Sequence, residues 1–170
     1  PIRASAMATD TPEACRRALG LNPDRKVLLL TGASQGARTL NQALPKIAGD
    51  RPEVFDGWQV LHLCGDESIV DTLKAAWTRA GVDATVLGFL HDMGQAWGAA
   101  DACVSRAGAS SVAEVHANAV PTIFLPYPFH RDNHQRLNAQ PLVDAGGAGM
   151  VTDEIDVDRT AVTLGDALST

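Results

Sequence analysis

The stretch KVLLLT at residues 26–31, followed by the turn GASQGA at residues 32–37, decides the fold. An almost unbroken apolar run of this length is typical of a strand that is buried on both faces, as in a parallel sheet. The glycines at 32 and 36 predict a tight turn, and the spacing of Leu40, Leu44 and Ile47 predicts a helix from about residue 37 to 48. The rest of the chain repeats this strand–turn–helix unit.

Short apolar runs and segments of helical spacing alternate along the remaining sequence. Strands are predicted at residues 59–63, 84–87, 102–105, 122–125 and 149–152, and helices at 11–20, 67–80, 92–100, 108–118, 133–145 and from 158 on. Pro45 is expected to kink or shorten its helix, and Asp158 to cap the last one. Because parallel strands need helical crossovers, this order predicts an α/β fold in one domain over residues 1–170. Its doubly wound, Rossmann-like parallel sheet would carry helices on both faces.

The composition excludes several classes of protein. Fourteen basic against twenty acidic residues give a net charge of −6, which lacks the basic footprint of a protein that binds nucleic acid. The cysteines at 15, 64 and 103 match neither a disulfide framework nor a zinc spacing, so we expect reduced thiols and a cytoplasmic protein. No apolar run approaches the roughly 20 residues of a membrane span. The chain begins Pro1-Ile2-Arg3, without a signal peptide or a Met, and we expect it to be part of a longer protein.

Ligands of doubly wound sheets bind beyond the carboxyl ends of the strands. This rule selects four predicted loops, at residues 32–36, 88–92, 106–111 and 126–135, which hold most of the glycines and polar residues that interrupt the apolar pattern. The first loop is either a plain strand-to-helix turn or an anion site, because free N–H groups and the helix dipole favour negative charge there.

The first loop is also similar to the cofactor loop of the short-chain dehydrogenases, through its pattern TGASxG. Arg38 stands where that pattern needs a third glycine, and it would crowd a pyrophosphate. Those enzymes also need a Tyr and a Lys one turn apart, whereas Tyr127 is followed four residues on by Arg131. A dehydrogenase is therefore disfavoured, because the pair of Tyr and Lys that its reaction needs is absent.

The loop RAGASSVAE at residues 106–114 is more informative. A strand ends, Gly108 allows a turn, and the N–H groups of residues 109–111 would point at a bound diphosphate. Glu114, one turn further along the helix, could accept hydrogen bonds from both hydroxyls of a ribose, as acids do in dinucleotide sites. An alternative is a capping box, in which Ser111 caps the helix and Glu114 bonds back to its start.

The other polar groups favour no metal site. Asp156 and Asp158 fit helix capping better than metal binding, and His130 and His134 are four residues apart without a third ligand. The tryptophans at 58, 77 and 97 are expected to be packing groups, and His62 to be a histidine of the core or of a sheet edge. No metal and no cofactor are predicted.

Taken together, the loops resemble the C-terminal half of the MurG family. The resemblance rests on four motifs in order: SQGA with Leu40-Asn41, FLHDM at 89–93, SRAGASSVAE at 105–114, and DNHQ at 132–135 with Asn138-Ala139. Members of that family transfer N-acetylglucosamine from UDP-N-acetylglucosamine to the undecaprenyl-linked muramyl-pentapeptide of peptidoglycan, in cell wall synthesis. They have the GT-B fold, two Rossmann-like domains with a cleft between them, and the resemblance covers nearly the whole chain.

The resemblance implies a role for each part of a UDP-N-acetylglucosamine site. Ser34 and residues 109–112 would contact the phosphates, Phe89 and the Leu90 backbone the uracil, Glu114 the ribose, and Gln135 with His134 the sugar. Arg3, in an interdomain link predicted at residues 1–10, would also approach the donor. The full set of implied binding residues is Arg3, Ser34, Phe89, Leu90, Ala109, Ser110, Ser111, Val112, Ala113, Glu114, His134 and Gln135.

This chain would then be the donor-binding domain of an inverting, metal-independent hexosyltransferase, inactive alone and without a catalytic residue of its own. The acceptor site, the general base and the membrane contact of the family lie in an N-terminal domain, and the whole enzyme is peripheral on the cytoplasmic face of the inner membrane. Two alternatives stay open. One is a stand-alone glycosyltransferase subunit that needs a membrane partner. The other is a GT-B transferase that uses another nucleotide sugar.

Overall fold

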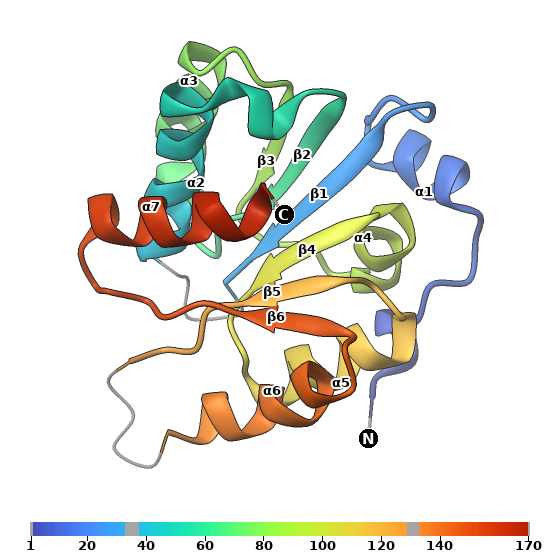
Figure 1. Ribbon diagram of the computed structural model, residues 1–170. Coiled ribbons are helices and arrows are strands. Elements are labelled where there is room, and N and C mark those ends of the chain that lie inside the picture. Colours follow the sequence, from blue (N-terminus) through green and yellow to red (C-terminus); the bar gives the residue numbers. More distant parts are fainter. Residues whose placement is uncertain (1, 33–37, 129–132, 170) are drawn as a thin grey trace.

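The computed structural model describes residues 2–32, 38–128 and 133–169. Its centre is a parallel sheet, whose strands run side by side through the middle of the molecule (Figure 1). The strands are β1 (Lys26–Thr31), β2 (Trp58–Leu63), β3 (Ala84–Leu87), β4 (Ala102–Ser105), β5 (Thr122–Phe124) and β6 (Ala148–Met150). All of the predicted strands form, and their bounds differ from the predicted ones by at most two residues.

The order of the strands is β3-β2-β1-β4-β5-β6, and every pair is parallel. The chain therefore starts in the middle at β1, moves outward to β3, and returns to the other side of β1 at β4. In register, Thr31 at the end of β1 lies beside Leu63 of β2 and Ser105 of β4. This order is the Rossmann order, and its switch point lies between β1 and β4.

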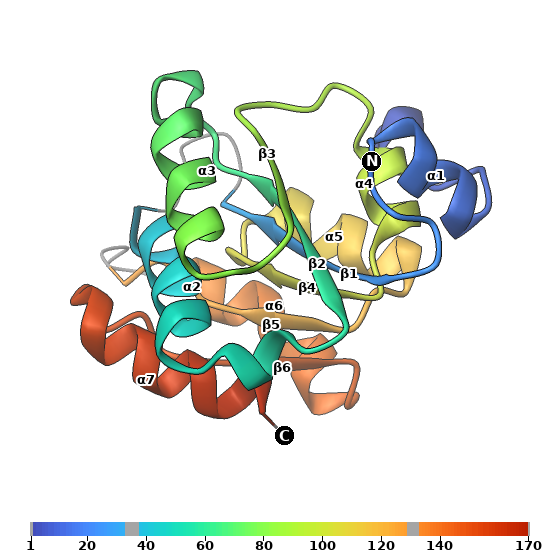
Figure 2. The same cartoon turned by 90° about the horizontal axis from the view of Figure 1, so that it is seen from above.

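Helices cover both faces of the sheet. Seen from above, α2, α3 and α7 lie on one side of it and α1 and α4 on the other (Figure 2). Helices α5 and α6 pack together, and α5 also contacts α4. The bounds are α1 Pro12–Ala18, α2 Arg38–Asp50, α3 Val70–Arg79, α4 Met93–Ala99, α5 Ala109–Asn118, α6 His134–Asp144 and α7 Val157–Leu168, with short 3-10 turns η1 Ala4–Ala6, η2 Pro52–Phe55 and η3 Glu67–Ile69.

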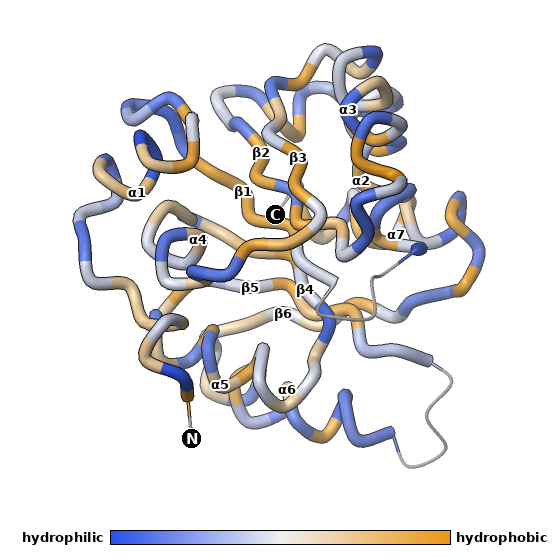
Figure 3. The backbone as a smooth tube through the Cα atoms, turned by 180° about the vertical axis from the view of Figure 1, so that it is seen from behind, coloured by the Kyte–Doolittle hydropathy of each residue, from blue (hydrophilic) through white to orange (hydrophobic). Residues whose placement is uncertain are grey.

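The apolar run of β1 is explained by two hydrophobic cores, one on each face of the sheet. Leu28 and Leu30 belong to the core under α2, α3 and α7, whereas Val27 and Leu29 belong to the core under α1, α4 and α5. Successive side chains of a strand point to opposite faces, so a strand buried on both faces needs apolar residues at consecutive positions. Figure 3 shows this contrast, because the tube is orange along β1 and largely blue along α6.

Three predictions about helix ends can be compared with the structure. Thr11 caps α1 as predicted, since its hydroxyl accepts the N–H of Ala14. Of the two alternatives predicted for Pro45, a kinked or a shortened helix, the shortening is wrong, because α2 continues five residues beyond Pro45 to Asp50. The N-cap of α7 is Asp156 and not Asp158, and its carboxylate accepts the N–H of Arg159.

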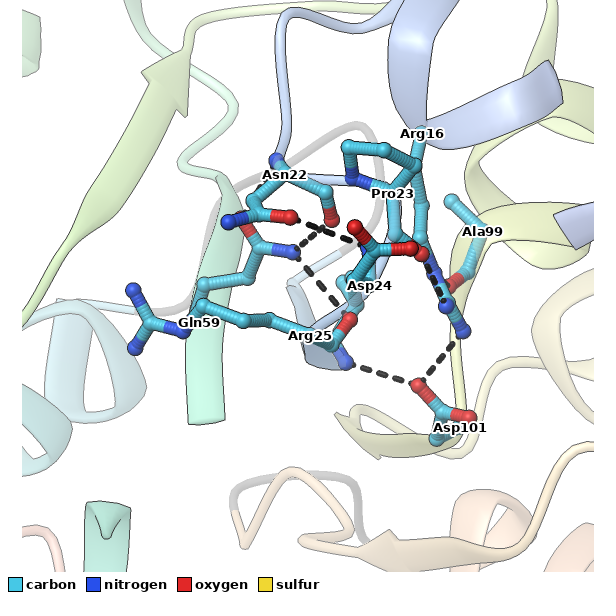
Figure 4. A network of polar contacts seen from close by, with 9 residues as sticks. Arg16, Asn22, Pro23, Asp24, Arg25, Gln59, Ala99 and Asp101 are labelled. Atoms are coloured by element: carbon cyan, nitrogen blue, oxygen red, sulfur yellow. Dashed lines mark hydrogen bonds and ion pairs between the residues drawn. The ribbon is translucent and has the colours of Figure 1, made fainter. Parts of the chain in front are cut away.

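At the amino-terminal edge of the sheet, side chains and backbone groups form a network of polar contacts (Figure 4). The buried guanidinium of Arg16 donates to the carbonyls of Ala99 and Pro23 and forms an ion pair with Asp101 at 2.9 Å. The same carboxylate oxygen of Asp101 accepts the N–H of Val27 at 2.7 Å. This edge therefore holds α1 against the start of β1, and its buried polar groups bond to each other.

The three cysteines are free and buried. Burial raises the pKa of the Cys15 and Cys103 thiols above the ordinary range, so both are poor nucleophiles. No helix in the described ranges is long and apolar enough to cross a bilayer.

Candidate functional site

The carboxyl-terminal edge of the sheet brings the predicted loops together. The loops after β1, β3, β4 and β5 all leave this edge, since every strand of the sheet is parallel. On either side of the switch point, α2 follows β1 onto one face and α5 follows β4 onto the other. Chains that diverge in this way leave a crevice at the sheet edge, where doubly wound proteins bind their ligands. Ser34 and residues 129–132 lie outside the described residues.

The turn between β4 and α5 offers uncapped N–H groups at this crevice. Gly108 is the N-cap of α5, and no side chain caps the helix. The first helical hydrogen bond runs from Val112 N to Gly108 O at 2.9 Å, which leaves the N–H groups of residues 109–111 directed out of the helix end. Ala109 and Ser110 are exposed, so a ligand can reach these groups.

Gly108 itself does not need to be glycine for the turn. Its φ is −63°, an ordinary value for any residue. A Cβ at this position would meet only the hydroxyl oxygen of Ser111, at 3.9 Å, which is ordinary van der Waals contact. The expectation that Gly108 supplies turn flexibility is therefore wrong. What the missing side chain does provide is open space beside the uncapped end of α5.

Glu114 lies on α5 and is held by a tryptophan. The indole N–H of Trp97, on α4, donates to Oε2 of Glu114 at 3.0 Å. Trp97 is 2% exposed, whereas Glu114 is half-buried. The alternative of a capping box is wrong, because α5 is capped at Gly108 and the Glu114 carboxylate bonds to another helix. The prediction that Trp97 is a packing group is incomplete, since it also fixes a polar side chain.

A buried ion pair between Arg106 and Asp153 stabilises the turn between β4 and α5. Arg106 and Asp153 form a 2.7 Å ion pair in which both side chains are at most 5% exposed. Arg106 also donates to the carbonyl of Leu125 at 3.0 Å, and its guanidinium lies 5.7 Å from the ring centre of Tyr127. This pair ties the ends of β4 and β5 to the segment after β6. Among the described residues, Nε of Arg106 is the single buried side-chain polar atom without a partner.

The start of α6 is tied to the same turn. Asn138 donates from Nδ2 to the carbonyl of Ala107 at 3.2 Å. The side-chain oxygen of Gln135 accepts the N–H of Tyr127 at 2.9 Å, which leaves the amide NH2 group of Gln135 as a donor. His134 is the first residue of α6 and is half-buried. The helix that begins with the two residues predicted to bind a sugar is therefore tied to the β4–α5 turn through Asn138 and to the segment after β5 through Gln135.

The remaining predicted residues, Phe89, Leu90 and Arg3, are exposed or half-buried. Phe89, after β3, is 55% exposed, so its ring is available to a planar ligand, and the adjacent Leu90 is half-buried. Arg3 is exposed at the start of η1, and no described contact links it to the other predicted residues. The segment that follows it is anchored to α5, because Asn118 donates to the carbonyl of Ala6 and accepts the N–H of Ala8.

On the other side of the switch point, a chain of hydrogen bonds fixes α2. Trp77 donates to Nδ1 of His62 at 3.1 Å, so the histidine proton lies on Nε2, which bonds to the Asn41 side-chain oxygen at 2.9 Å. Asn41 in turn donates to the carbonyl of Cys64 at 3.0 Å. Burial lowers the pKa of His62 to about 3, so the ring is neutral. His62 was predicted to lie either in the core or at a sheet edge, and it is a core histidine.

Two further features of the described residues bear on the choice of site. A groove of about 850 Å³ lies between α2 and α3 and is lined by Asn41, Pro45, Lys46 and Leu73, but by none of the predicted binding residues. No group of three His, Cys, Asp or Glu side chains in the described ranges could hold a metal ion. The sheet edge at the switch point, and not this groove, collects the predicted loops.

The sequence also matches known proteins. Residues 27–164 match the family model of the glycosyltransferase family 28 C-terminal domain. The chain belongs to this family. The matched range runs from β1 into α7, so the family 28 domain includes the whole sheet and every loop of the crevice. The fold predicted for the C-terminal half of a GT-B glycosyltransferase is confirmed, and so is the resemblance on which it was based.

Two curated relatives of this family 28 domain carry the same name, UDP-N-acetylglucosamine--N-acetylmuramyl-(pentapeptide) pyrophosphoryl-undecaprenol N-acetylglucosamine transferase. The protein from Nocardioides sp. is 42% identical over 158 residues, which cover 90% of this chain and 42% of that protein. The protein from Xanthomonas euvesicatoria is 39% identical over 172 residues, which cover 100% of this chain and 37% of that protein. The chain thus spans about two fifths of the length of these relatives.

Solved structures agree with the family. MurG of Acinetobacter baumannii superposes with a TM-score of 0.73 at 27% identity, over 94% of this chain and 46% of that one. WaaG, a glycosyltransferase of lipopolysaccharide biosynthesis, superposes with a TM-score of 0.66 over 99% of this chain and 46% of that one. At 15% identity, WaaG shows a likeness of fold alone.

Sequence reasoning missed three groups of the site: Trp97 as a donor, the Arg106–Asp153 pair, and Asn118. One signal was present, because a charged residue directly after a buried strand, as Arg106 is, needs a partner. Nothing in the sequence indicated that Asp153 is that partner, since the ends of β4 and β6 come close only in the folded sheet.

Proposed function

We propose that this chain is the donor-binding domain of a transferase that moves N-acetylglucosamine from UDP-N-acetylglucosamine to undecaprenyl-pyrophosphoryl-muramyl-pentapeptide. The names of the relatives support the reaction and the donor. The observation that carries the proposal is the pairing of an uncapped helix start with a fixed carboxylate one turn away, at the switch point of a family 28 domain. The two groups match the two polar parts of a nucleoside diphosphate.

In this proposal the N–H groups of residues 109–111 bind the diphosphate. They stabilise its charge when the sugar leaves, as preorganised donors do, and the site needs no metal for this step. Ser34 and Val112 would complete the phosphate contacts. The diphosphate carries the charge that develops in the reaction, so this helix end contributes directly to the rate.

The rest of the donor binds around this centre. Glu114 accepts hydrogen bonds from the ribose hydroxyls, and Phe89 lies against the uracil while the Leu90 backbone bonds its edge. Gln135 and His134 bond the hydroxyls of the sugar. Arg3, in the interdomain link at residues 1–10, also approaches the donor.

The remainder of the longer protein would supply what this chain lacks. A general base must remove the proton of the acceptor hydroxyl, and a membrane-facing surface must hold the lipid-linked acceptor. The whole enzyme would act as a peripheral protein on the cytoplasmic face of the inner membrane. In this division of labour the present chain binds the donor and stabilises the leaving group.

Calorimetric titration with UDP tests the donor site. We expect binding in the millimolar range or tighter, with Glu114→Ala weakening UDP binding about tenfold, or about 1.4 kcal/mol. The same variant should change the affinity for inorganic diphosphate less than about twofold, because the lost groups face the ribose. Glu53→Ala, at an exposed glutamate of η2 on the opposite edge, is the matched control.

Two outcomes would contradict the proposal. The first is the absence of UDP binding at millimolar concentration. The second is an equal loss for UDP and diphosphate in Glu114→Ala, which would remove the ribose role. Competition between UDP-N-acetylglucosamine and other UDP-sugars then tests the donor, and a stronger competitor among them would favour a GT-B transferase with another substrate.

A further inference from the structure

The conformation of the Glu114 carboxylate is set by another helix. A glutamate side chain has several rotatable bonds, and fixing it costs up to about 2 kcal/mol of conformational entropy. Among the described contacts of its carboxylate, the hydrogen bond from Trp97 at 3.0 Å is the one that fixes it. An indole N–H can only donate, so the direction of this bond is unambiguous.

Trp97 is a rigid donor. It is 2% exposed and belongs to the hydrophobic core under α1, α4 and α5, together with Cys15, Val115 and Ala139. The helix that carries it packs closely, since a Cβ at Gly98 would lie 2.6 Å from the sulfur of Cys15. The indole therefore cannot follow the carboxylate if the carboxylate turns away, and the carboxylate is held in one place.

We propose that Trp97 is a positioning residue, which orients Glu114 so that the site selects a ribonucleotide over a 2′-deoxyribonucleotide. The proposal rests on the ribose role of Glu114 in the proposed function. A carboxylate has about four acceptor positions, so the bond to Trp97 leaves Oε1 and part of Oε2 for the two hydroxyls of a ribose. A fixed acceptor loses more than a mobile one when a hydroxyl is missing, because it cannot turn to another donor.

The backbone of the same residue is also supported. Asn118 donates from Nδ2 to the carbonyl of Glu114 at 2.9 Å, and the same amide group donates to the carbonyl of Ala6. The side chain and the main chain of Glu114 are thus held from two directions. Preorganisation of this kind raises affinity and selectivity because the ordering cost is met before the ligand arrives.

The test measures binding of UDP, 2′-deoxy-UDP and inorganic diphosphate to the full chain by calorimetry. The unaltered chain should prefer UDP over 2′-deoxy-UDP about tenfold, and Trp97→Phe should reduce this preference to about twofold with unchanged diphosphate binding. Trp97→Tyr keeps a donor on an aromatic ring and should restore most of the preference. A full preference in Trp97→Phe would overturn the positioning role while the proposed function stands.

A spectroscopic readout needs no variant. The indole N–H of Trp97 should shift in a ¹H–¹⁵N spectrum on addition of UDP but not of diphosphate, with Trp58 and Trp77 as internal references. An unmoved Trp97 signal at saturating UDP would also overturn the positioning role. Failure of the unaltered chain to bind UDP would instead contradict the proposed function, so the two failures can be told apart.

Discussion

Two tryptophans each donate to a polar side chain, one on each face of the sheet, and the two centres differ in how their hydrogen bonds end. From Trp77 the chain passes through His62 and Asn41 and ends on the carbonyl of Cys64. From Trp97 it ends on the carboxylate of Glu114, which is half-buried. In the first centre the polar groups bond to one another, whereas in the second the Glu114 carboxylate keeps free acceptor positions.

This difference separates a structural centre from a binding centre. A buried polar network in which the members bond to one another fixes the packing of a core, and a missing member leaves its partner unsatisfied. A carboxylate that keeps free acceptor positions beside solvent can be hydrated or can bind a ligand. In the proposed function, the same type of donor residue therefore serves stability on one face and recognition on the other.

The largest expected effect comes from the same substitution made in both centres. Trp77→Phe should lower the free energy of unfolding by about 3 kcal/mol, because it leaves a cavity and the unsatisfied Nδ1 of His62 in the core. Trp97→Phe should leave a similar cavity, because this indole is 2% exposed, but it should cost about 1 kcal/mol less, since water can reach the released carboxylate. Urea unfolding of both variants measures the difference, and equal losses would contradict the division between the two centres.

The second prediction concerns pH. The pKa of His62 is about 3 in the folded protein, against an ordinary value of 6.5, so the unfolded chain takes up the proton first as the pH falls. Stability should be independent of this group above pH 6.5 and fall by about 1.4 kcal/mol per pH unit below it, until pH 3.

Urea unfolding at several pH values, compared with His62→Gln, isolates this effect of pH. The variant should be less stable at pH 7 but should lack the additional loss between pH 6.5 and 5, where most carboxylates stay ionised. Parallel curves for the two proteins would show that the histidine does not titrate as described.

A third prediction separates binding from stability at the start of α5. Gly108→Ala should change the free energy of unfolding by less than about 0.5 kcal/mol, because the loss of a preferred N-cap residue is offset by the smaller conformational entropy of the unfolded chain. It should weaken diphosphate binding about tenfold, since the new methyl group would occupy the approach to the N–H groups. Calorimetry and urea unfolding on the same sample check both, and unaltered diphosphate binding would remove the anion role of this turn.

The smallest expected effect lies at the other end of the same helix. Ala119 has a φ of +53°, a left-handed conformation that favours glycine. Ala119→Gly should therefore raise the free energy of unfolding by about 0.5–1 kcal/mol. Ala117→Gly, two residues earlier within the helix, should lower it by a similar amount. Thermal unfolding measures both, and a loss of stability in Ala119→Gly would argue against strain at this position.

Local sequence signals predicted the elements well. The apolar run of β1, the cap at Thr11 and the strand–helix alternation each depend on neighbours along the chain, and the structure confirms them. Long-range partners were not predicted. The bond from Trp97 to Glu114 joins two helices, and the ion pair of Arg106 with Asp153 joins two strand ends, so neither has a local pattern.

For the candidate site, too, the sequence predicted the position of the loops but not the surroundings of the side chains. Sequence placed Phe89, residues 109–111, His134 and Gln135 in loops at one sheet edge and Glu114 on the helix that follows one of them, and the structure puts those loops at the same edge. It did not reveal that Gly108 is conformationally ordinary or that Glu114 is not part of a capping box. Both findings depend on side-chain surroundings, which a linear pattern does not specify.

The sequence by itself determined the fold class, the family and the edge at which the loops meet, because periodicity and motif order are properties of the chain. The tertiary structure alone decided which polar side chains are satisfied inside the protein and which keep capacity for a ligand. The physical reason is that a hydrogen bond forms between groups at a distance of about 3 Å, wherever they stand in the sequence. Trp77 and Trp97 are the same residue type, and only their partners in space distinguish them.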